Sequence, residues 1–100
     1  MTITDIKIRK IINEGRMKAV ISITIDDMLA IHDIKVIQGP NRLFVAMPSR
    51  RDDNGIFRDI VHPIKPEVRE EIEETLLQAY EEQISILEAH EEELAEQTEE

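Results

Sequence analysis

Three arginines, Arg50, Arg51 and Arg58, are the side chains whose spacing in this sequence most favours a chemical function. Arg50 and Arg51 follow an apolar run that ends at Pro48, and a proline cannot donate the hydrogen bond that continues regular strand pairing. Residues 52–55 read Asp-Asp-Asn-Gly, which is typical of a tight turn, and the strand-like segment after it returns Arg58 toward the pair. Because guanidinium groups bind phosphates through parallel hydrogen bonds, the spacing indicates a phosphate-binding cluster.

The same segment also permits a neutral interpretation. Asp52, Asp53 and Asp59 lie beside the arginines in the sequence and could neutralise them locally. Taken alone, the residues leave a phosphate-binding cluster and a locally neutralised one equally open.

The histidines form no recognisable catalytic or metal-binding pattern. His32 with Asp33, or His62, could act as a general base, but neither a nucleophile motif nor a glycine-rich oxyanion loop accompanies them. His32, His62 and His90 lack the spacing of metal ligands, and the sequence has no cysteine. We therefore expect a protein that is not an enzyme and that uses no metal, cofactor or small-molecule substrate.

Composition indicates one small domain with an aliphatic core. The chain has 100 residues, of which 41% are hydrophobic but only 3% are aromatic. No segment resembles a secretion signal, and no apolar run approaches the ~20 residues of a membrane helix. We expect a cytoplasmic protein with no membrane partner.

Charge is divided unevenly along the chain. Residues 1–65 contain 11 Lys and Arg against 8 Asp and Glu, a net charge of +3, whereas residues 66–100 contain one Arg against 14 Glu, a net charge of −13. The overall charge of −10 therefore hides a slightly basic body and a strongly acidic tail, which leaves nucleic-acid binding open. We expect the tail to compete with phosphate for the arginines.

Alternating apolar residues predict an antiparallel sheet of about five strands, at residues 2–12, 17–25, 29–38, 43–47 and 57–62. In the first strand Ile6, Ile8 and Ile12 share one face, opposite Lys7, Arg9 and Ile11. The alternation of the third strand changes phase, so a bulge near His32 and Asp33 should keep Leu29, Ile31, Ile34 and Val36 buried. The unbroken apolar run 43–47 is typical of a central strand covered on both faces.

A C-terminal amphipathic helix should begin at Pro66, since proline suits the first helical position. Val68, Ile72, Leu76 and Ala79 form one apolar stripe that can pack on the sheet. The fold class is therefore α+β, with residues 1–80 as a sheet-plus-helix domain and residues 81–100 as an acidic helical tail. Whether one long helix or two successive helices form stays open.

Four segments together resemble the bacterial stage V sporulation protein G family, also called the septation protein family. They read Glu-Gly-Arg-Met at 14–17, His-Asp-Ile-Lys-Val-Ile at 32–37, Leu-Phe-Val-Ala-Met-Pro-Ser-Arg-Arg at 43–51, and Phe-Arg-Asp-Ile-Val-His-Pro-Ile at 57–64. The last two are specific when they occur together in one short chain.

The resemblance implies a small α+β dimer that is linked to sporulation and septum formation. It also implies site-specific binding of DNA, and sometimes of RNA, by a regulatory protein. Carried over residue by residue, the expected nucleic-acid contacts are Arg50, Arg51, Arg58, Lys65 and Arg69.

A second apolar stripe on the helix predicts where a homodimer would form. Leu77, Tyr80, Ile84 and Leu87 recur with 3,4 spacing, which is typical of a helix–helix seam. The alternative function is a protein-interaction module of the division or septation machinery that contacts its partners through the acidic helix and binds no nucleic acid.

Overall fold

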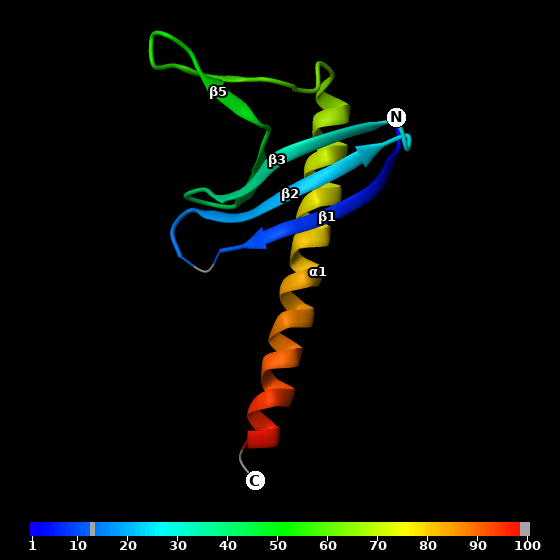
Figure 1. Ribbon diagram of the computed structural model, residues 1–100, viewed down its shortest axis with the longest axis vertical. Coiled ribbons are helices and arrows are strands. Elements are labelled where there is room, and N and C mark those ends of the chain that lie inside the picture. Colours follow the sequence, from blue (N-terminus) through cyan, green and yellow to red (C-terminus); the bar gives the residue numbers. More distant parts are fainter. Residues whose placement is uncertain (13, 99–100) are drawn as a thin grey trace.

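A four-stranded antiparallel sheet, a short two-stranded ribbon and one long helix make up the protein (Figure 1). The computed structural model describes residues 1–12 and 14–98, and side-chain environments within that range as far as Glu92. The elements follow in the order β1 (Ile3–Ile11), β2 (Met17–Ile25), β3 (Leu29–Gln38), β4 (Leu43–Ala46), β5 (Ser49–Arg51), β6 (Phe57–Asp59) and α1 (Pro66–Thr98). The α+β class is confirmed.

The strands predicted as one antiparallel sheet of about five divide between a four-stranded sheet and a two-stranded ribbon. β1 to β4 pair in sequence order, whereas β5 and β6 pair only with each other within the described residues. Pro48 separates β4 from β5, and its carbonyl accepts a hydrogen bond of 2.8 Å from the N–H of Ile60, so the chain turns into a separate ribbon.

β4 is an edge strand and not the central strand expected of residues 43–47. Val45 and Met47 are buried at 4% and 7% exposure, while their neighbours Phe44 and Ala46 are only half-buried. An apolar run of five residues thus has one face on the core and one face partly open. The run alone could not distinguish this arrangement from burial on both faces.

The bulge predicted near His32 and Asp33 is confirmed. Ile21 pairs with Ile34 and Ile23 with Ile31, so two β3 residues lie opposite one β2 residue, and Asp33 has a φ of 63°. This shift keeps Ile31, Ile34 and Val36 on the buried side. Leu29 does not follow them, since it is 55% exposed at the last pair before the β2–β3 turn.

A second bulge in β1 corrects the predicted faces of that strand. Ile8 pairs with Ile21, but the next pair joins Lys10 to Val20, so Arg9 is the extra residue. The phase therefore changes, and Ile11 shares the helix-facing side with Ile6 and Ile8 instead of lying opposite them.

α1 is one unbroken helix of 33 residues that packs across one face of the sheet and extends past it (Figure 1). Ile72 and Leu76 belong to the buried core, and Val68 packs against it, as the first stripe predicted. The helix continues through the proposed boundary at residue 80 without a break. In the part of the chain that the structure describes, no helix has the length and hydropathy needed to cross a bilayer.

The contact between Leu76 and the sheet should dominate stability. Leu76 is 0% exposed, so Leu76→Ala should lower the free energy of unfolding by about 2–5 kcal/mol. Urea denaturation followed by circular dichroism measures this loss. Ile86→Ala is the matched control because Ile86 is 61% exposed, and it should change stability by less than about 0.5 kcal/mol. Equal losses for the two variants would contradict the placement of the core.

Candidate nucleic-acid interface

β5, the turn 52–56 and β6 form a projecting ribbon, called here the arginine hairpin (Figure 1). Its register places Arg50 directly opposite Arg58, and Arg51 opposite Phe57. Because strand residues alternate between faces, Arg50 and Arg58 share one face of the ribbon, and Arg51 and Phe57 share the other. Like charges opposed in this way repel each other, which makes an anion between Arg50 and Arg58 favourable.

Asp52 organises the turn of the arginine hairpin. Its Oδ1 accepts hydrogen bonds from the backbone N–H groups of Asn54 at 2.9 Å and Ile56 at 3.0 Å. Its Oδ2 accepts a hydrogen bond of 2.8 Å from Nε of Arg58. Gly55 has a φ of 81°, a conformation that glycine adopts without strain. One carboxylate therefore fixes both the turn and the position of Arg58.

This contact lowers the pKa of the Asp52 carboxyl below its ordinary value of 3.8. The hydrogen bond from Arg58 is the largest cause, and the backbone hydrogen bonds from Ile56 and Asn54 act in the same direction, partly opposed by desolvation. Asp52 is therefore ionised at neutral pH and offsets part of the Arg58 charge.

The three arginines are gathered at one place, as the sequence predicted. Together with Asp52, Asp53, Asp59 and Ile60 they line an open hollow of about 340 Å³. Local neutralisation applies to Arg58 alone, since the ion pairs among the described residues are Arg58–Asp52 and Arg42–Glu73. Arg50 and Arg51 are exposed and take part in neither pair.

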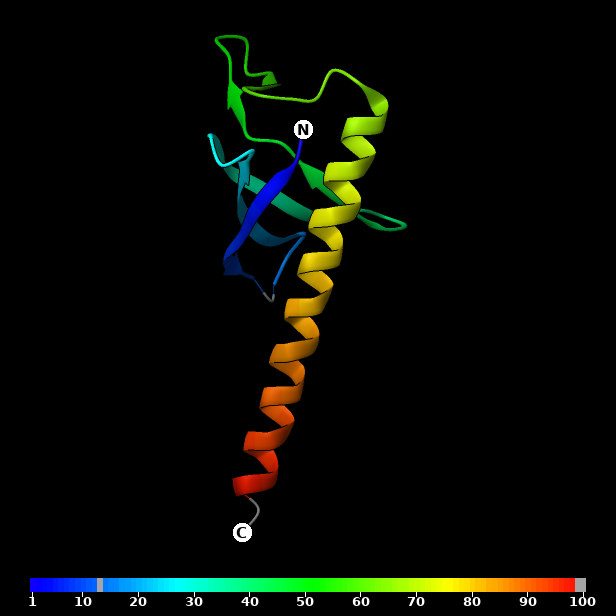
Figure 2. The same ribbon diagram turned by 90° about the vertical axis from the view of Figure 1, so that its right-hand side faces the viewer.

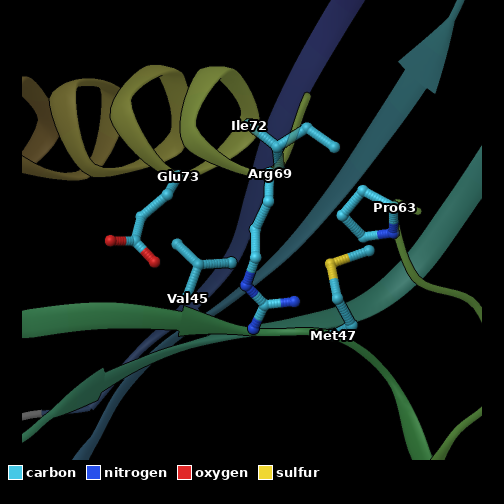
Figure 3. A pocket seen from close by; sticks show the side chains of 6 residues that line it. All are labelled: Val45, Met47, Pro63, Arg69, Ile72 and Glu73. Atoms are coloured by element: carbon cyan, nitrogen blue, oxygen red, sulfur yellow. The ribbon is translucent and has the colours of Figure 1, made fainter. Parts of the chain in front are cut away.

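Lys65 and Arg69 lie apart from the arginine hairpin, at the start of α1. Figure 3 shows Arg69 reaching from the helix toward Val45 of β4 and Met47, which follows that strand, with Glu73 on the same helix nearby. The cavity that these residues line has about 10 Å³, roughly the room for one water molecule, so it is a packing gap and not a ligand pocket. Five residues separate β6 from Lys65, so the expected contacts are divided between the arginine hairpin and the start of α1.

The four residues of the predicted helix seam divide into two pairs. Leu77 and Tyr80 pack against the protomer's own core, and burial raises the pKa of the Tyr80 hydroxyl above 10.0. Ile84 is half-buried and Leu87 is 38% exposed, so these two are more available to a partner.

Exposed apolar side chains around the arginine hairpin are the feature that sequence reasoning missed. Ile56, Phe57, Ile60 and Ile64 are 53%, 68%, 67% and 87% exposed. The available signal was the high apolar content of residues 56–64, which read Ile-Phe-Arg-Asp-Ile-Val-His-Pro-Ile. Two-stranded ribbons are only marginally stable alone, so these side chains provide surface for a partner.

The coupling between Asp52 and Arg58 gives a pH-dependent prediction. The depressed pKa of Asp52 means that its stabilisation of the turn is present above the unfolded value near 3.8 and is lost as pH falls through the lower folded value. Carbon-13 NMR of the Asp52 carboxyl should show a midpoint below 3.8, and Arg58→Gln should raise that midpoint. Arg50→Gln is the control, since Arg50 forms no ion pair with Asp52. A midpoint unchanged by Arg58→Gln would show that the pair does not form in solution.

Comparison with known proteins places this fold and its arginine hairpin in a family. The SpoVG family model matches residues 1–82. A protein of Desulforudis audaxviator is 54% identical over 81 residues, covering 81% of this chain and 92% of its own length. One from Clostridioides difficile is 55% identical over 82 residues, covering 82% and 89% respectively. The names of both refer to septation and to SpoVG. The chain therefore belongs to the SpoVG family, the septation protein family that its motifs resemble.

Proposed function

We propose that this SpoVG-family protein is a dimeric regulator, linked to septation and sporulation, that binds specific sites on DNA and also binds RNA. The observation that carries the proposal is the arginine hairpin. It holds Arg50 opposite Arg58 and leaves Arg50 and Arg51 outside the ion pairs of the described residues. These guanidinium groups stand on a ribbon that projects from the sheet (Figure 2).

A two-stranded ribbon has dimensions that suit DNA. The major groove of B-DNA admits such a ribbon, and arginine pairs with phosphate oxygens or with the O6 and N7 atoms of guanine. The two faces of the ribbon can make different contacts with nucleic acid. Arg50 and Arg58 on one face can hold a phosphate, while Arg51 on the other face is free to contact a second phosphate or a base edge.

The predicted acidic tail, which begins at residue 81, lies away from this site. Figure 1 shows the arginine hairpin near one end of the molecule and the end of α1 at the other, and the longest dimension is 56 Å. Interactions between exposed charges are screened over about 8 Å at physiological ionic strength. The arrangement therefore gives no support to competition between the tail and the arginines within one protomer.

Dimerisation is supported by surface that one protomer leaves open. Phe57, Ile60 and Ile64 are exposed around the arginine hairpin, and Ile84 and Leu87 lie on α1. The strands β1 and β4 are the two edges of the sheet. A symmetric pair would cover such surface and present two arginine hairpins to one nucleic acid.

A protein-interaction module is the second candidate function. The same exposed apolar residues favour it. Ile60 and Ile64 are 67% and 87% exposed, and their side chains can contact a protein partner but cannot bind phosphate. Salt distinguishes the two functions, since nucleic-acid binding weakens steeply with ionic strength and apolar contacts do not.

Replacing Arg50 and Arg51 tests the nucleic-acid proposal. The double variant Arg50→Ala/Arg51→Ala should fold normally, because both side chains are exposed, and should bind duplex DNA less tightly. Each lost phosphate contact should flatten the slope of log affinity against log salt by about 0.9, hence about 1.8 per protomer engaged. If one arginine reads a guanine instead, its loss should cost roughly 1–3 kcal/mol at one base position. Fluorescence anisotropy with genomic fragments measures both effects.

The matched control removes the same charge elsewhere. Arg16→Ala/Arg42→Ala changes two exposed arginines, one in the β1–β2 turn and one before β4, and should leave most of the affinity intact. Because Arg42 is paired with Glu73, circular dichroism should first show that this variant is folded. Wild-type affinity and wild-type salt slope in the folded Arg50/Arg51 variant would remove the arginine hairpin from the site.

The helix seam can be tested by mass. Ile84→Asp/Leu87→Asp should weaken the dimer, because it places two charges on the two residues of the predicted seam that do not pack against the protomer's own core. Gln78→Asp/Ser85→Asp adds the same charges at exposed polar positions of α1 and should leave the dimer intact. Sedimentation equilibrium reports the mass. An unchanged dimer in the first variant would assign dimerisation to another surface, and a wild-type protein seen only at 11.6 kDa would contradict the dimer itself.

A further inference from the structure

The face of the sheet opposite α1, called here the open face, carries a group of cations. In Figure 2 the helix lies along one side of the sheet and no other element covers the opposite side. Paired strand residues lie on the same face, which places Lys7 beside Ser22, and both Lys10 and Lys35 beside Val20. Two strands, β1 and β3, thus bring lysines to one surface on either side of β2, on the side of the sheet away from the core.

Ser22 lies at the centre of this group. It is 6% exposed and is the buried polar residue among the described side chains. Its Oγ accepts a hydrogen bond from Nε of Arg9 at 3.3 Å and lies 2.9 Å from Nδ1 of His32. A guanidinium from β1 and an imidazole from β3 are therefore fixed on the two sides of one hydroxyl in β2.

Both partners of Ser22 reach it through irregularities of the sheet. Arg9 is the extra residue of the β1 bulge, and His32 belongs to the β3 bulge in which Asp33 has a φ of 63°. Bulges redirect single side chains and are common beside functional sites. Two of them, on either side of the same β2 residue, converge on one point of the open face.

The cations of the open face keep most of their binding capacity. The Arg9 guanidinium has four N–H donors besides Nε, and the Nε2 atom of His32 is not engaged by Ser22. Lys7, Arg9 and Lys35 take part in neither ion pair of the described residues. Two carboxylates belong to the same region, Asp5 near the start of β1 and the exposed Asp33 in the bulge.

Apolar side chains accompany the cations. Ile37 pairs with Phe44, next to the Lys35–Ala46 pair, and both side chains are half-buried on the open face. Proteins that bind single strands commonly stack an unpaired base on an aromatic ring while neighbouring cations bind the backbone phosphates. A duplex keeps its bases stacked inside and offers nothing to such a ring.

We propose that the open face binds a single nucleic-acid strand, with backbone phosphates on Arg9, His32, Lys7 and Lys35 around Ser22 and a base on Phe44. The inference rests on the proposed nucleic-acid function and gives it a second surface. The arginine hairpin takes duplex DNA, and the open face takes an unpaired strand of DNA or RNA.

The test compares single-stranded and duplex probes on the full chain. Lys7→Gln/Lys35→Gln should flatten the salt slope for a labelled dT strand of about 16 nucleotides by about 1.4, and should leave binding to a mixed-sequence duplex unchanged. Phe44→Leu should weaken the same strand about fivefold or more through lost stacking. Arg16→Gln/Arg42→Gln is the charge-matched control and should keep wild-type binding to the strand.

The two sites fail in different ways. Loss of duplex binding in Arg50→Ala/Arg51→Ala, with single-strand binding kept, supports both surfaces. Single-strand binding unchanged in Lys7→Gln/Lys35→Gln, or lost equally with duplex binding, overturns the open-face site and leaves the arginine hairpin standing. A smaller mass for that variant by sedimentation would show that a second copy covers the open face, which also overturns the inference. If Lys7→Gln/Lys35→Gln loses single-strand binding while Arg50→Ala/Arg51→Ala keeps wild-type duplex binding, the open-face site is supported and the arginine hairpin is not the duplex site.

Discussion

One helix packs against one face of four strands, and that contact constrains every other surface of the protein. Ile21, Ile34 and Leu76 are each 0% exposed where β2, β3 and α1 meet. Their burial removes aliphatic surface from water, the main favourable term in folding. Within the described residues no second helix covers the opposite face. That face must therefore tolerate solvent, and it does so with lysines, Arg9 and a hydroxyl that is hydrogen-bonded on both sides.

The bulges at Arg9 and at the 32–33 step resolve a conflict between local alternation and one-sided burial. A strand with strict alternation sends every second residue to the core, but β1 and β3 each change phase partway. An extra residue at Arg9 and at the 32–33 step returns the later isoleucines, Ile11 and Ile34, to the buried side. Arg9 and His32, which lie in these two bulges, are polar, and both contact Ser22 on the open face. The same geometry that completes the core thus concentrates hydrogen-bonding groups outside it.

Local patterns predicted those parts of the structure that local chemistry determines. The bounds of β2 and β3, the bulge at 32–33 and the helix start at Pro66 follow from alternation, a change of phase and the properties of proline. The gathering of Arg50, Arg51 and Arg58 also followed, because a proline, a turn and a strand-like segment are consecutive, but the pairing of residues 49–51 as β5 was not predicted. The edge position of β4 and the distance of Lys65 from Arg50 depend on which distant segments pair, and no single stretch of sequence contains that information.

The length of α1 has a geometric consequence of its own. Thirty-three helical residues without an interior glycine or proline span about 50 Å, well beyond the width of a four-stranded sheet. Because the helix is unbroken, its far end keeps a fixed position relative to the sheet. A fluorophore or a binding domain joined there would be held at a set distance from the ribbon of β5 and β6. The molecule can in this way serve as a ruler between two attached objects.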